Sequence, residues 1–160
     1  MDTLLPAAHR IGALLKASGE KIAVSESSAG GLISAALLAV PGASAYFMGG
    51  AVVYTRQSRR LLLDLPDAAL DGVPPSSEAY AAMMAGAIQQ RFSLTWGLAE
   101  TGATGPTGNR YGNNAGHACL AIAGPRPAAL TVETGHGDRA ANMRAFALAT
   151  LELFERALRG

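Results

Sequence analysis

The sequence predicts an α/β fold: a single three-layer α/β/α domain over residues 1–160 with a mixed, mostly parallel sheet. Helical and strand-like segments alternate over the first two thirds of the chain, whereas the last two strand-like segments are adjacent. Alternation is typical of parallel strands joined by helices, and adjacent strands favour an antiparallel pair. The length of 160 residues suits one domain, and no internal repeat or linker is present.

Helical spacing of apolar residues and turn residues set the elements of the first half. Ser18-Gly19 stops the first helix and Pro41-Gly42 stops the second, while Gly49-Gly50 leads into the second strand. The expected elements are helix 5–18, strand 21–25, helix 30–40, strand 51–54 and helix 56–64.

The second half follows the same signals. Ser76 or Ser77 is the expected N-cap of a helix that runs to about residue 92, and Asp138 is the expected N-cap of the last helix. Residues 124–127 suit a hairpin-like turn. Residues 101–116 form a glycine-rich loop, and a loop of this length is usually functional. The expected strands are 94–100, 117–123 and 128–133.

Composition excludes several classes of function. The chain is 49% hydrophobic with a net charge of +1, and its longest basic run is Arg59-Arg60, so we expect no nucleic-acid partner. No long apolar run or leader-like N-terminus is present, so we expect no membrane association and a cytoplasmic protein. Cys119 lies in an apolar run, which predicts a buried thiol. No cluster at metal-ligand spacing occurs, and neither a metal nor another cofactor is expected.

Three predicted strands end in small polar residues. These strand ends are residues 26–31, Tyr54-Thr55-Arg56 and residues 101–106. Ligands of α/β sheets bind beyond the carboxyl ends of the strands, so the three ends predict one pocket if they converge. The alternative is that each merely forms a tight turn or a helix cap.

These segments resemble the CinA carboxy-terminal domain family, which includes the nicotinamide-nucleotide amidases. Residues 26–33 are similar to that family's Glu-Ser-Cys-Thr-Gly-Gly-Leu segment, and the later segments occur in the family's order over nearly the whole chain. The other similar segments are residues 40–44, 53–59 and 101–106, and Gly137-Asp138-Arg139 with Arg144.

The resemblance implies a metal-independent amidohydrolase that converts nicotinamide mononucleotide to nicotinic acid mononucleotide. By position, Ser27 would be the nucleophile and Tyr54 its polar neighbour, and N–H groups near Gly30-Gly31 would hold the oxyanion. Ser28, Ala29 and the threonines and glycines of residues 101–105 would surround the substrate, with two arginines holding its phosphate. The implied substrate-binding residues are Ser28, Ala29, Gly30, Gly31, Thr101, Gly102, Thr104, Gly105, Arg139 and Arg144.

The main departure from the family is Arg59, which stands where the family has its catalytic lysine. An arginine keeps its proton at neutral pH and is a poor general base, so Arg59 would stabilise charge instead. Neither Lys16 nor Lys21 is expected near Ser27. His117, just after the glycine-rich loop, is the alternative base, against an ordinary strand-end histidine.

Glu100 also departs from the family, which has an apolar residue there. We expect a strand-end carboxylate turned to solvent; the alternative is that Glu26 and Glu100 pair with arginines at positions 56, 59 or 60 in a charged pocket.

Two functions therefore remain open for a small-molecule nucleotide ligand: amide hydrolysis through Ser27, or binding without catalysis in a regulatory protein. Small residues on the helix from Ser77 suit close packing, within the domain or in the homo-oligomer that we expect.

Overall fold

A five-stranded sheet in the order β2-β1-β3-β4-β5 is the centre of the computed structural model, which describes residues 1–160. β1 pairs in parallel with β2 and β3, whereas β4 is antiparallel to β3 and to β5. Every strand except β4 therefore runs in one direction. The strands are β1 (Ile22–Glu26), β2 (Phe47–Val52), β3 (Trp96–Ala103), β4 (His117–Ala123) and β5 (Ala128–Glu133).

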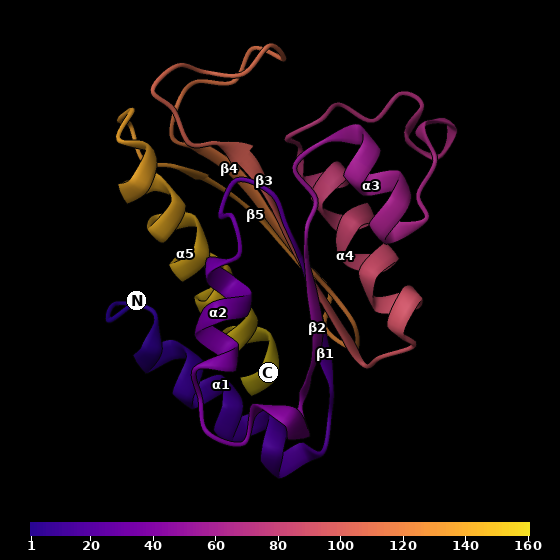
Figure 1. The fold of residues 1–160 in the computed structure, drawn as a ribbon, viewed down its shortest axis with the longest axis vertical. Coiled ribbons are helices and arrows are strands. Elements are labelled where there is room, and N and C mark those ends of the chain that lie inside the picture. The colour runs from indigo at the N-terminus through magenta and orange to yellow at the C-terminus, as the bar shows by residue number, and fades with distance from the viewer.

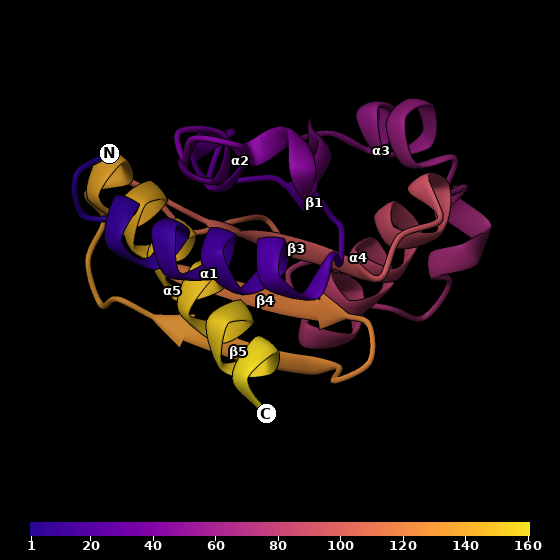
Figure 2. The ribbon, with the colours of Figure 1, turned by 90° about the horizontal axis from the view of Figure 1, so that it is seen from below.

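Helices cover both faces of this sheet, as the two views in Figure 1 and Figure 2 show. Helices α1, α2 and α5 lie on one face, and α4 lies on the other with α3 beside it. The helices are α1 (Leu5–Ser18), α2 (Leu32–Leu38), α3 (Arg56–Leu63), α4 (Glu78–Phe92) and α5 (Arg139–Arg159), with short 3₁₀ turns at Ala43–Ala45 and Asp67–Leu70. The predicted three-layer α/β fold with a mixed sheet is confirmed.

The alternation of strand residues divides the core into two parts. Ile22 and Val24 of β1 pack toward α1, α2 and α5, whereas Ala23 between them packs toward α4. On the first face, the ring of Trp96 meets Phe154 of α5 edge to face, with ring centroids 5.4 Å apart. Small residues dominate the α4 face, so this helix approaches the sheet closely.

The predicted helix starts at Ser77 and Asp138 are confirmed. Each side chain accepts a hydrogen bond from the backbone N–H three residues later, at Tyr80 and Ala141. Cys119 is buried as predicted. No helix is both long and apolar enough to span a membrane.

Two strands differ from the sequence prediction. β2 begins at Phe47, so Gly49 and Gly50 lie inside the strand rather than before it. A Cβ on Gly49 would contact the Phe92 ring, and a Cβ on Gly50 would meet Ser34, so these glycines let the strand lie close to its neighbours. β3 continues to Ala103, which shortens the glycine-rich loop.

Candidate functional site

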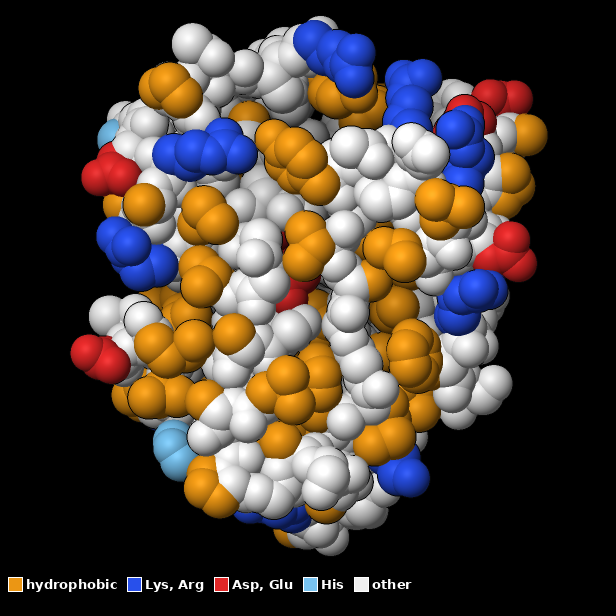
Figure 3. Space-filling view, viewed as in Figure 1, with side chains coloured by type: hydrophobic (Ala, Val, Ile, Leu, Met, Phe, Trp, Pro, Cys, Tyr) orange, Lys and Arg blue, Asp and Glu red, His pale blue; other side chains and the backbone are white.

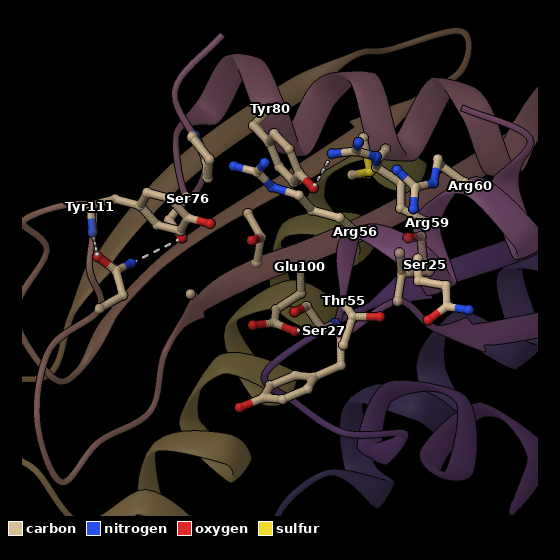
Figure 4. Close-up of a pocket in the computed structure, with 18 of the residues that line it drawn as sticks. Ser25, Ser27, Thr55, Arg56, Arg59, Arg60, Ser76, Tyr80, Glu100 and Tyr111 are labelled. Atoms are coloured by element: carbon tan, nitrogen blue, oxygen red, sulfur yellow. Dashed lines mark hydrogen bonds between the residues drawn. The ribbon is translucent and has the colours of Figure 1, made fainter. Parts of the chain in front are cut away.

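A polar cavity of about 620 Å³ lies at the carboxyl ends of β1 and β3, between the sheet edge and helices α3 and α4. Figure 3 shows a hollow near the centre of one face with acidic atoms inside it, and basic side chains are spread over the upper part of that face. Figure 4 shows the side chains that point into the cavity. Its polar lining includes Ser25, Ser27, Arg56, Arg59, Ser76, Tyr80, Glu100, Thr101, Asn109, Arg110 and Tyr111.

The turn from β1 into α2 is fixed by the carboxylate of Glu26, which is fully buried. Its oxygens accept hydrogen bonds from the backbone N–H groups of Gly31, Ile33 and Ser34 at 2.9 to 3.1 Å. They also accept the Ser34 hydroxyl at 2.6 Å. This carboxylate therefore provides the N-terminal cap that α2 does not receive from Gly31, the residue before the helix.

Glu100 holds the same turn from β3. Its Oε2 accepts the N–H groups of Ser27 at 3.0 Å and Ala29 at 2.8 Å, and its Oε1 accepts the Ser28 hydroxyl. The side chain is nearly inaccessible to solvent, and this burial raises the pKa of Glu100 above its ordinary value, against the hydrogen bonds, which lower it. The expectation that Glu100 faces solvent is wrong, because β3 extends past this residue and places it in the interior.

The carboxylates of Glu26 and Glu100 occupy the backbone N–H groups that were expected to hold the oxyanion of the reaction. The N–H groups of Ser27, Ala29, Gly31, Ile33 and Ser34 are all occupied by Glu26 or Glu100. In this conformation they are not free to hold a tetrahedral intermediate, so the predicted oxyanion site at the start of α2 is wrong.

Arg59 lines the cavity but is held in its wall. Its guanidinium forms an ion pair with Asp67 and donates to the Leu65 carbonyl at 3.3 Å and the Tyr80 hydroxyl at 3.4 Å. Arg60 donates to the same Asp67 carboxylate. The alternative in which Arg56, Arg59 or Arg60 pairs with Glu26 or Glu100 is therefore wrong, since Arg59 and Arg60 pair with Asp67 and Arg56 forms no ion pair.

The other two predicted catalytic positions lie at the cavity as well. Ser27 is half-buried, and Tyr54 is exposed, with its hydroxyl 3.4 Å from an Arg139 nitrogen. A smaller cavity of about 220 Å³ adjoins the first, because Tyr54, Gly102 and Asn109 line both. Its remaining lining includes the predicted residues Ser28, Thr104, Gly105 and Arg139, and Thr101 lines the larger cavity.

Several predicted site residues lie elsewhere. Ala29 is buried in the core, and Gly30 and Gly31 line neither cavity because they form the turn. Arg144 is exposed on α5 and lines neither cavity, since Arg139 at the start of that helix is the arginine that reaches the smaller one.

His117 does not supply a base to the cavity. Its Nε2 is 2.8 Å from the Ser76 carbonyl oxygen, and its Nδ1 contacts the Glu133 carboxylate. The ring thus supports Ser76, which has a left-handed backbone (φ 56°) and a hydroxyl that accepts from Asn109. The alternative in which His117 supplies the base is therefore wrong, since its ring nitrogens contact Ser76 and Glu133.

The sequence prediction missed Arg110, and it named Arg56 only at a strand end and as an alternative partner of Glu26 or Glu100. Arg56 at the start of α3 and Arg110 in the glycine-rich loop line the larger cavity, and neither has an acidic partner. Arg110 lies over the Tyr111 ring, 5.4 Å from its centroid. The polar segment at 54–56 was one available signal for Arg56; for Arg110 the glycine-rich composition of its loop was the only one.

Comparisons with known proteins agree with this architecture. The family model of the CinA C-terminal domain matches residues 5–158 of this chain. A CinA-like protein of Synechococcus sp. (strain CC9902) is 40% identical over 132 residues, which are 82% of this chain and 31% of that protein. A CinA-like protein of Synechocystis is 36% identical over 129 residues, again 31% of its length. The chain thus spans about a third of the curated relatives that it matches.

Solved structures are similar over the whole domain. A competence/damage inducible protein of Agrobacterium tumefaciens superposes with a TM-score of 0.87 at 28% identity, covering 99% of this chain and 96% of the other. A CinA superfamily protein of Klebsiella pneumoniae gives a TM-score of 0.90 at 23% identity, covering 98% of both chains, which shows the shared fold.

Proposed function

The chain belongs to the CinA C-terminal domain family, and from this membership we propose that it hydrolyses the amide of nicotinamide mononucleotide or a related nucleotide. Ser27 is the proposed nucleophile. The single observation that carries the proposal is that Ser27 and Tyr54 line the same polar cavity as Arg56 and Arg110, which have no acidic partners.

The size and charge of the cavity suit such a substrate. A volume of about 620 Å³ is within the range of small-molecule sites. Arginine binds phosphate oxygens through paired N–H groups, so Arg56, Arg110 and Arg139 are suited to a nucleotide phosphate. The amide carbon would then lie near Ser27, whose hydroxyl attacks it, releases ammonia and leaves an acyl group for water to hydrolyse.

A second function is favoured by one observation. Arg59 stands at the position of the family's lysine and is fixed by its ion pair with Asp67, and a guanidinium is not a general base in proteins. If nothing else accepts the Ser27 proton, the protein binds the nucleotide without hydrolysing it.

Two assays on the same protein separate these functions. Ammonia release from nicotinamide mononucleotide is measured for wild type, Ser27→Ala and the control Ser44→Ala, an exposed serine outside both cavities. Calorimetry measures binding of the same nucleotide. We expect release by wild type and by Ser44→Ala, a fall of about 1,000-fold or more in Ser27→Ala, and similar binding by all three. Binding without release would establish the second function, and the absence of both would refute the choice of ligand.

A further inference from the structure

Only one side chain of the cavity lining has the chemistry of a general base. The ionisable side chains of its lining are arginines, tyrosines and Glu100, and no lysine, histidine or cysteine is among them. Arginine and tyrosine titrate far above pH 7 in water, whereas a carboxyl titrates below it. Glu100 is therefore the one side chain of the lining with the chemistry of a general base.

The hydrogen bonds of Glu100 leave one acceptor position open. Each carboxylate oxygen offers two lone pairs. Oε2 uses both, on the N–H groups of Ser27 and Ala29, whereas Oε1 has one protein donor, the Ser28 hydroxyl. The second lone pair of Oε1 is free for a donor in the cavity.

The Ser27 hydroxyl is a suitable donor for this position. The Ser27 N–H already lies 3.0 Å from Oε2, and Figure 4 shows Ser27 beside the Glu100 carboxylate. The Ser27 hydroxyl has no hydrogen bond to another protein group, in contrast to that of Ser28. Rotation among the staggered χ1 positions moves the Ser27 Oγ without disturbing the backbone that Glu100 holds.

The surroundings keep this carboxylate reactive. No arginine or lysine forms an ion pair with Glu100. Of the arginines that line the cavity, Arg59 and Arg60 are bound to Asp67, and Arg56 and Arg110 have no acidic partner. Burial raises the pKa of Glu100, and the charge of Glu26 acts in the same direction. A carboxylate with a raised pKa holds a proton more readily, as a general base must.

We propose that Glu100 is the general base and acid of this site and replaces the lysine that the family uses. The proposal rests on the proposed function. Glu100 takes the Ser27 proton as Oγ bonds to the amide carbon, and it gives that proton to the nitrogen as the C–N bond breaks and ammonia leaves. Glu100 then takes a proton from the attacking water and returns it to Ser27 Oγ as the acyl group leaves as the acid.

The test measures ammonia release from nicotinamide mononucleotide by Glu100→Gln and by the control Glu152→Gln, an exposed carboxyl on α5. We expect kcat of Glu100→Gln to fall about 100-fold or more, with nucleotide binding changed less than about threefold, and no change in the control. Wild-type kcat/KM should rise with pH along an acidic limb that Glu100→Gln lacks. An unchanged kcat in Glu100→Gln would overturn the role of Glu100 alone, whereas no release by wild type would overturn the proposed function as well.

Ser28→Ala is a second variant, useful if Glu100→Gln does not fold. The Ser28 hydrogen bond lowers the pKa of Glu100, so its loss should move the acidic limb of kcat/KM to higher pH, whatever the height of the pH profile. A merely structural carboxylate would leave the limb in place, which would overturn the proposal. Loss of all activity in Ser28→Ala with retention in Ser27→Ala would also overturn it, because Ser28 would then be the nucleophile.

Discussion

Replacing Glu26 with alanine should remove a large part of the stability of the domain. The buried carboxylate accepts three backbone N–H groups of the α2 turn and the Ser34 hydroxyl. Hydrogen bonds to a charged group contribute about 1.5 to 3 kcal/mol each, and donors left without a partner in the interior add a desolvation cost. Water that enters the space offsets part of this loss.

We therefore expect Glu26→Ala to lower the free energy of unfolding by about 4 kcal/mol, out of a total of about 5 to 15 kcal/mol for a domain. Urea unfolding followed by circular dichroism measures the difference, and Glu152→Ala, at an exposed position of α5, is the matched control, expected to change stability by less than about 0.5 kcal/mol. A loss below about 1 kcal/mol in Glu26→Ala would refute the view that this carboxylate caps α2.

Two further predictions concern packing and pH. Gly97→Ala should destabilise the domain by about 3 kcal/mol in urea unfolding, since its Cβ would lie 2.1 Å from the Ala85 carbonyl oxygen of α4. Gly86 lies on α4, and a Cβ there would meet nothing within 4 Å, so Gly86→Ala should stabilise the domain by about 0.5 to 1 kcal/mol. Equal effects of the two substitutions would contradict the close packing of α4 against β3. Hydrogen bonding to Arg10 lowers the pKa of Glu155 to about 2, so its contribution is present above the ordinary value of 4.5 and is lost as pH falls toward 2. Glu155→Gln should thus cost about 1 kcal/mol in thermal unfolding at neutral pH and progressively less as pH falls from 4.5 toward 2, and a difference that does not shrink over this range would contradict the ion pair.

Local sequence signals predicted most of the fold. Helix caps such as Ser77 and Asp138 are local, because the capping side chain and the N–H it accepts are three residues apart. The start of β2 was missed because Gly49 and Gly50 look like a turn in the sequence. Their role depends on Phe92 and Ser34, which come from other elements.

The site was harder to predict because its decisive contacts are distant in sequence. Ser27 and Tyr54 follow strands whose ends converge, so a shared pocket could be expected. Glu100 shares its strand face with Trp96 and Leu98, and this period of two was a signal for burial. Its partners, however, are the backbone atoms of a turn about 70 residues earlier, and no local pattern indicates them.

Ammonia release from nicotinamide mononucleotide by wild type and Arg59→Lys shows whether hydrolysis in this cavity needs a lysine. If the cavity hydrolyses the amide without a lysine, wild type releases ammonia, and Arg59→Lys gains nothing because it loses the contacts with Leu65, Asp67 and Tyr80. Release by Arg59→Lys together with an inactive wild type would contradict this account, because the missing lysine would then be what separates this cavity from an amidase.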